Sequence, residues 1–199
     1  MASIAAERGV DPLDALLDVV VADELRTVIA TPFRGADEES WLLRQRAVRD
    51  HRTIPGGSDS GAHLDMLDTF TLATRLLGPT VRDRGSFGLE EAVHLMTGVP
   101  AALYGITGRG HLAEGAWADL FVFDPETIDA GPVGLRHDLP GGASRLYGDA
   151  VGVHHVVVNG VEIVAGNQLT GALPGRVIRS GRDTTTVTAA DALTGKWRR

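Results

Sequence analysis

The sequence predicts an α/β fold in which helices alternate with short strands up to residue 106, while strands dominate the rest. Before Gly108, apolar residues recur mainly at helical spacing, with short β-branched segments between the helices. Beyond Gly108, short apolar strands are separated by glycines and include an Asn-Gly turn. We therefore expect two parts, residues 1–106 and residues 107–199, with the boundary near Ile106 to Arg109.

The first elements have clear local signals. Asp11 is suited to cap a helix, and Pro12 fits its first turn. The segment Thr27–Ala30 is short and β-branched and is followed by Pro32, so it is predicted to be a buried strand. A second helix is predicted to open at Asp37–Glu39, whose acidic side chains favour a helix N-terminus.

Three further helices are predicted before the residue pattern changes near Gly108. Apolar residues recur at helical spacing from Leu64 to Leu77, so a helix should follow His63 directly. Ser86 is the expected cap of the next helix. Pro100 is expected to begin a short helix that ends at Gly105.

The C-terminal part is predicted to be a small β module. Asp119–Asp124 reads as one strand, and Val153–Val158 with Val161–Val164 forms a predicted hairpin around Asn159-Gly160. The tail from Ser180 to Arg199 is equally consistent with a loose end and with a docking strand.

The segment from Thr53 to His63, with the sequence TIPGGSDSGAH, is the first candidate for chemistry. A short apolar stretch leads into two glycines and then Asp59, as if a carboxylate were placed at the end of a buried strand. In a β/α barrel the active-site groups collect at the C-terminal ends of the strands. A simple Ser-Asp-Ser turn is the competing interpretation.

Composition narrows the function classes. The 199 residues are 43% hydrophobic and 23% charged, which is ordinary for a globular chain. A net charge of −7 gives no electrostatic reason to expect nucleic acid or an anionic membrane as a partner. Without cysteine, a metal site must use His, Asp or Glu. The N-terminus lacks a secretory pattern and no apolar run is long enough to span a bilayer, so the expected location is the cytoplasm.

Four segments occur in a characteristic order: Gly57–His63, Leu89–Ala101, Gly108–Leu120, and Val157–Gly160 continuing to Gly171–Arg176. In this order they resemble the C-terminal portion of metal-dependent amidohydrolases, closest to the D-aminoacylase (N-acyl-D-amino-acid deacylase) group. The resemblance covers roughly residues 5 to 180.

This resemblance implies a fold and a role for Asp59. It implies the last βα units of a (β/α)8 TIM-type barrel followed by a small β-sandwich module, with one or two divalent metals, usually zinc. Asp59 resembles the carboxylate that ligates the metal and acts as acid and base toward the attacking water. His63, four residues further on, is the candidate substrate-binding residue; a capping or supporting role is the alternative.

Much of the family pattern is absent from this sequence. The His-x-His pair, the bridging ligand and the later histidine pair do not occur. His154 and His155 lie in a predicted strand, where alternation points them to opposite faces. A barrel needs about 250 residues, so the chain resembles a part of such an enzyme, and the part alone is expected to bind little or no metal and to be inactive.

The remaining candidates have simpler interpretations. His94, His111 and Trp117 are read as packing residues. Three arginines match the geometry of a substrate carboxylate, although solvated charges at helix ends are the commoner role for such residues; they are Arg75, Arg82 and Arg84.

Three functions remain open at this stage. The first is hydrolysis of linear amides such as N-acyl-D-amino acids. The second is hydrolysis of a cyclic amide or deamination of a ring, because fold does not fix substrate. The third is a non-catalytic structural or partner role, together with an upstream barrel segment or through self-association.

Overall fold

A computed structural model describes residues 1–27, 35 and 37–194. The chain divides into two compact units, Met1–Trp41 and Leu42–Arg199. Of the strand expected at Thr27–Ala30, only Thr27 lies within the described ranges. The last five residues of the tail also lie outside them.

The N-terminal unit contains a helical hairpin. Helix α1 spans Ala2–Arg8 and ends at Gly9, whose φ of 67° is the left-handed conformation typical of a residue that follows a helix. Helix α2 spans Pro12–Ala22, and Asp11 Oδ1 accepts a hydrogen bond of 2.8 Å from the backbone N–H of Leu13. The predicted cap at Asp11 is therefore confirmed.

Helices build most of the chain before residue 104. Helix α3 crosses the boundary between the units, and the Asp37 side chain accepts a hydrogen bond from the Ser40 backbone N–H at 2.9 Å, as expected for a capping residue. A π-helix, η1, continues α4. The helices are α3 (Glu38–Arg49), α4 (Leu72–Arg75), η1 (Leu76–Asp83), α5 (Leu89–Met96), α6 (Gly98–Leu103), the 3₁₀ turn η2 (Pro140–Gly142) and α7 (Ala189–Leu193).

Three expectations for this part are wrong. Helix α3 continues through Arg49, and no strand forms before Gly56 within residues 37–57. The chain after His63 turns instead of becoming helical, and its first helix begins at Leu72. Ser86 does not cap α5; its hydroxyl accepts a hydrogen bond from Gln45 Nε2 at 3.1 Å.

A physical reason accounts for the missing strand. A parallel strand is held by hydrogen bonds from neighbouring strands, and a single extended segment has none of these. Between residues 37 and 119 the structure describes one isolated bridge, at Ile106, and no named strand. The apolar residues after His63 have helical spacing, but many remain exposed, so no packed surface selects the helix there.

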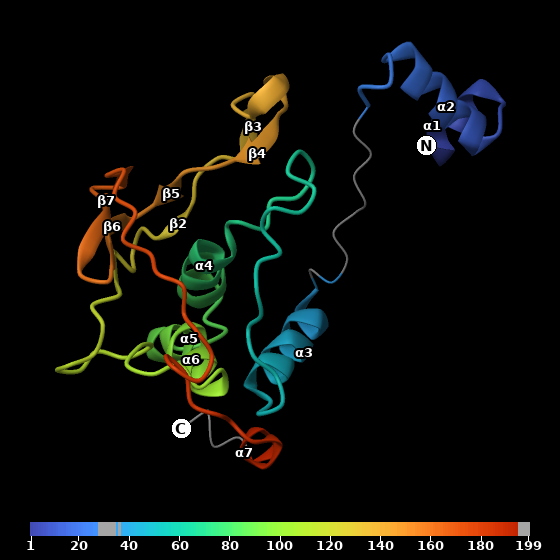
Figure 1. Cartoon of the computed structure of the whole chain (residues 1–199). Helices are drawn as coiled ribbons and strands as arrows, with labels where there is room; N and C mark the ends of the chain where they lie inside the picture. Colours follow the sequence, from blue (N-terminus) through green and yellow to red (C-terminus); the bar gives the residue numbers. More distant parts are fainter. Residues whose placement is uncertain (28–34, 36, 195–199) are drawn as a thin grey trace. The chain divides into compact units, whose positions relative to one another are not determined.

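The strands all lie beyond residue 119 in the described chain, as the change of pattern near Gly108 predicts (Figure 1). A four-stranded antiparallel sheet has the order β1-β6-β7-β8, and Asn159 and Gly160 close the predicted hairpin with φ of 50° and 79°. Two small ribbons, β2-β5 and β3-β4, complete the module. The strands are β1 (Leu120–Phe123), β2 (Asp129–Ala130), β3 (Gly134–Arg136), β4 (Arg145–Tyr147), β5 (Ala150–Val151), β6 (Val153–Val158), β7 (Val161–Ala165) and β8 (Gln168–Leu169).

The core joins the helices to the sheets. Ile128 and Val99 are its largest fully buried side chains. Gly78 of η1 approaches the carbonyl of Ile128 so closely that a Cβ there would lie 2.3 Å from the oxygen. The buried residues of this cluster are Leu77, Val81, Phe87, Ala92, Leu95, Val99, Ile128 and Val153.

Part of the C-terminal tail docks onto the end of α6. Thr184 bridges Ile106, and the Thr185 backbone N–H donates to the Gly105 carbonyl at 2.8 Å. For residues 183–185, the docking alternative left open by the sequence is therefore the correct one. None of the helices described is long and apolar enough to cross a bilayer.

Candidate functional site

Asp59 lies on an exposed turn after an irregular segment. Its φ of 55° is left-handed, which is uncommon outside glycine, although aspartate adopts it more readily than most residues. The Asp59 carbonyl closes the turn by accepting from the Ala62 backbone N–H at 3.2 Å. An observed backbone outlier of this kind is a legitimate pointer to function, and the exposed carboxylate is accessible to a ligand.

His63 begins a second turn directly after the first. It is also exposed, with a φ of 45°. Its carbonyl accepts from the backbone N–H groups of Met66 and Leu67, both at 2.9 Å. The helix expected directly after His63 does not form, so the alternative capping role has no helix to cap, and the loop presents Asp59 and His63 on two consecutive turns.

The donor set around Asp59 does not fit a complete metal centre. A protein zinc site uses at least three side-chain ligands. Within the described part of the chain, no group of three His, Asp or Glu side chains is arranged to hold a metal ion. Asp59 can therefore serve as one ligand, while the described residues do not assemble a set of three.

Two cavities flank the glycines that lead to Asp59. One, of about 310 Å³, includes Ser58 and the ion pair between Arg75 and Asp68, whose atoms are 2.7 Å apart. The other, of about 620 Å³, is mainly apolar. Its lining residues are Val48, Ile54, Pro55, Gly56, Gly57, Leu72, Leu76, Leu95, Met96, Pro100 and Tyr104.

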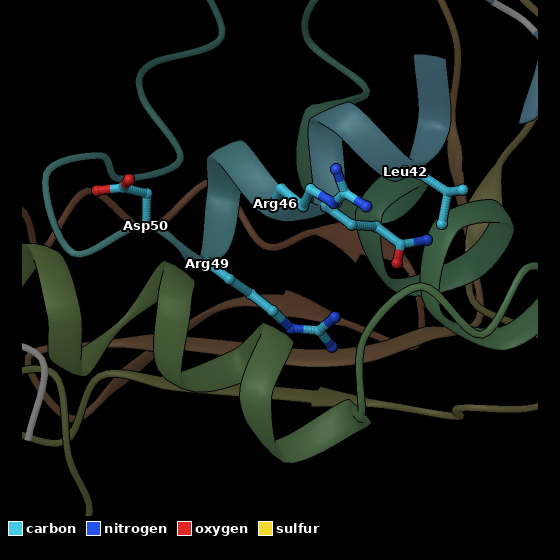
Figure 2. Close-up of a pocket in the computed structure, with 5 residues that line it drawn as sticks. Leu42, Arg46, Arg49 and Asp50 are labelled. Atoms are coloured by element: carbon cyan, nitrogen blue, oxygen red, sulfur yellow. The ribbon is translucent and has the colours of Figure 1, made fainter. Parts of the chain in front are cut away.

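A third cavity lies on α3 and is a poorer candidate. It measures about 430 Å³, and Figure 2 shows Arg49 extending away from the helix and Asp50 at the opposite end of the pocket from Leu42. Arg49 holds Glu91 with two hydrogen bonds of 2.8 and 2.9 Å, and its guanidinium lies over the Phe87 ring. These contacts fix α3 to α5, which is a structural role.

Arg82 is also structural. Its guanidinium donates to the Ile128 carbonyl at 2.7 Å and pairs with Asp83 at 2.7 Å and with Asp129 at 3.3 Å. These bonds tie η1 to β2. The Arg82 side chain therefore stabilises the fold, and its hydrogen bonds are made within the protein rather than to a substrate.

Sequence reasoning missed a polar cluster centred on Arg109. The Arg109 guanidinium hydrogen-bonds Asp119 and Asn159, and the Asn159 amide donates to the Pro174 carbonyl at 2.7 Å. Partial burial would raise the pKa of Asp119, yet hydrogen bonds from the Asn159 backbone and from Arg109 leave it lowered. The cluster joins the segments around Gly108–Leu120, Val157–Gly160 and Gly171–Arg176. All three carry the resemblance to the amidohydrolases, and their joint presence in the sequence is the signal that could have revealed the cluster.

Trp117 belongs to the same cluster. The Arg109 guanidinium lies over its ring at 5.0 Å from the centroid, and that of Arg176 lies over it at 4.6 Å. The packing role expected for Trp117 is thus a stacking contact with two cations, with 43% of the residue exposed. His111 is exposed rather than packed.

Arg176 extends the cluster to the docked tail by pairing with Asp183 at 2.8 Å. Hydrogen bonds from the Arg182 side chain and the Arg179 backbone N–H lower the pKa of Asp183 to about 2. This arrangement holds the tail in place and has no obvious chemical task.

Comparison with known proteins places the chain in a family. A family model described as "Amidohydrolase family" matches residues 5–164. The D-aminoacylase of Alcaligenes xylosoxydans xylosoxydans is 35% identical over 175 residues, which are 88% of this chain and 32% of that protein. The N-acyl-D-glutamate deacylase of the same organism is 36% identical over 184 residues, covering 90% of this chain and 33% of that protein.

Solved structures agree with the sequence comparison. A crystal structure of D-aminoacylase, described as defining a novel subset of amidohydrolases, aligns with a TM-score of 0.53 and 33% identity over 85% of this chain and 32% of its own. A second D-aminoacylase structure, described as having a binuclear metal centre, gives a TM-score of 0.54 at the same identity and coverage. The chain spans about a third of the length of these relatives.

Proposed function

Because this chain belongs to the amidohydrolase family, we propose that it forms the C-terminal part of a metal-dependent hydrolase of linear amides such as N-acyl-D-amino acids. The observation that carries the proposal is the 35% identity to D-aminoacylase over 88% of the chain. The proposal includes a barrel portion in residues 1–106, a β-sandwich module in residues 107–199, and a cytoplasmic location.

Asp59 is the proposed metal ligand and acid/base group of the complete site. Its exposed carboxylate on a left-handed turn, next to two cavities, supports this role. His63, on the adjoining turn, is the proposed substrate-binding residue. The divalent metal of the complete enzyme, which we propose to be zinc, requires further ligands that the described residues do not provide.

A non-catalytic role is the second candidate, and one observation favours it. No three-ligand cluster forms in the described part of the chain, so the chain can act as a structural partner without chemistry of its own. In either case the proposed partners are an upstream barrel segment or a second copy of the chain, together with a small amide substrate if the assembly is catalytic. A cyclic-amide substrate has no such supporting observation.

The test places Asp59 in a complete barrel. The matching third of D-aminoacylase is replaced by this chain, and Asp59→Asn is compared with Asp65→Asn, an exposed carboxylate in the same loop. Asn keeps the shape and removes the base, so Asp59→Asn should lower kcat by about 10²-fold or more. Asp65→Asn should leave kcat unchanged.

The thermal midpoint of each chimera is measured beside its kcat. If Asp59→Asn lowers the midpoint and leaves kcat unchanged, Asp59 is only a turn residue. A parent chimera that folds and binds metal but hydrolyses no N-acyl-D-amino acid would favour the structural role.

A further inference from the structure

A small β-ribbon lies on the loop that carries Asp59. Strands β3 and β4 pair antiparallel, with Arg136 opposite Arg145. The Leu146 backbone N–H of β4 donates to the Leu64 carbonyl at 2.6 Å, and Leu64 directly follows His63. Figure 1 shows the ribbon beside this loop. A ribbon more than 70 residues away in sequence is thus attached to the candidate site.

The ribbon carries two arginines stacked on one aromatic ring. The guanidinium of Arg136 lies 3.3 Å from the Tyr147 ring centroid, and that of Arg145 lies 5.0 Å from it. Stacking on an aromatic face fixes the plane of a guanidinium and leaves its N–H edges available for hydrogen bonds. The ring therefore preorganises both cations.

The two arginines differ in what their N–H groups do. Arg145 donates from Nε and Nη2 to the two carboxylate oxygens of Asp138, both at 2.7 Å, so its edge is occupied. Arg136 contacts Asp149 through one nitrogen at 3.5 Å, and 47% of its side chain is exposed. Asp149 also accepts from the Tyr147 hydroxyl at 3.0 Å. The Arg136 guanidinium is therefore held in place by the Tyr147 ring and retains N–H groups that can bind another anion.

We propose that Arg136 binds the carboxylate of the N-acyl amino acid substrate, which makes the β3-β4 ribbon a specificity element of the site. The inference rests on the proposed function, because that function supplies a substrate with a carboxylate. A guanidinium fork matches a carboxylate in two parallel hydrogen bonds, so the ribbon would select acids over their esters or amides.

The test measures binding and needs neither metal nor turnover. The metal-free 199-residue chain, labelled with ¹⁵N, is titrated with N-acetyl-D-leucine and, separately, with its methyl ester. The acid should shift the Arg136 Nε–H signal and the Leu146 amide signal in a saturable manner, and the ester should not. Arg136→Gln should weaken the binding of the acid by about tenfold or more, the effect of losing a charged hydrogen-bond donor.

The matched control is Arg52→Gln, which removes another exposed arginine paired with a carboxylate. This variant should bind the acid as the parent chain does, and unchanged amide signals elsewhere verify that both variants are folded. Equal shifts with acid and ester, no saturable shift in the parent, or full binding by Arg136→Gln would overturn the inference. Hydrolysis by the chimera is scored separately, so either proposal can fail alone.

Discussion

At the scale of single residues, Asp119 is the anion that holds the Arg109 cluster together. It accepts from the Asn159 backbone N–H at 2.8 Å and pairs with Arg109, whose side chain is only 13% exposed. Removing the charge leaves a mostly buried guanidinium without its anion, which is costly. We expect Asp119→Asn to lower the free energy of unfolding by about 1 to 2 kcal/mol.

Asp138→Asn is the matched control for Asp119→Asn. Asp138 pairs with Arg145 through two hydrogen bonds of 2.7 Å, but both side chains are more exposed, so solvent screens the pair. Urea unfolding of the two variants should show the larger loss at Asp119. Equal losses would mean that the Arg109 cluster is an ordinary surface ion pair.

Only part of the candidate site could be predicted from the sequence. Glycines beside Asp59 were sufficient to select that residue, because its type and its neighbours are visible in the sequence. Its left-handed backbone and the hydrogen bond from Leu146 to Leu64 were not, because they depend on turns and on a ribbon that is distant in sequence. The role of Asp59 stays a prediction.

At the scale of elements, local signals predicted local structure. The capped helix at Asp11 and the hairpin at Asn159-Gly160 need only neighbouring residues, and both were predicted correctly. The strand before Gly56 and the helix after His63 depend on packing partners, and both predictions failed. Spacing alone does not say whether a partner surface is present.

The docked tail provides a prediction at the same scale. Gly105 ends the turn after α6 with a φ of 63°, and a Cβ there would lie 2.0 Å from the Thr185 carbonyl oxygen. Gly105→Ala therefore adds left-handed strain and forces the tail away. We expect it to lower the free energy of unfolding by about 2 to 4 kcal/mol.

Gly115→Ala separates the two causes. Gly115 has a φ of 83°, and no atom lies within 4 Å of a Cβ built there, so this variant carries the backbone strain alone. It should cost about 1 kcal/mol. If urea unfolding gives the same loss for both variants, the contact between Gly105 and Thr185 does not hold the tail.

At the scale of the whole molecule, the family model matches most of the chain. The chain itself spans only about a third of the length of its relatives. Helices α3, η1, α5 and α6 and strands β1, β5, β6 and β7 contribute side chains to one hydrophobic core, and residues 42–199 form one compact unit. A complete set of metal ligands is not present among the described residues. Asp59 is the one carboxylate proposed as a ligand.

The chain alone should therefore fold but neither retain metal nor hydrolyse amides. A single carboxylate binds zinc too weakly to survive desalting, because a stable site uses at least three protein ligands. We expect well under one zinc per chain by elemental analysis after desalting, and no release of D-amino acid from N-acyl-D-amino acids. The D-aminoacylase chimera, prepared in the same way, is the positive control. Stoichiometric zinc that is lost in Asp59→Asn, together with turnover by the 199-residue chain, would show that its residues complete the site unaided.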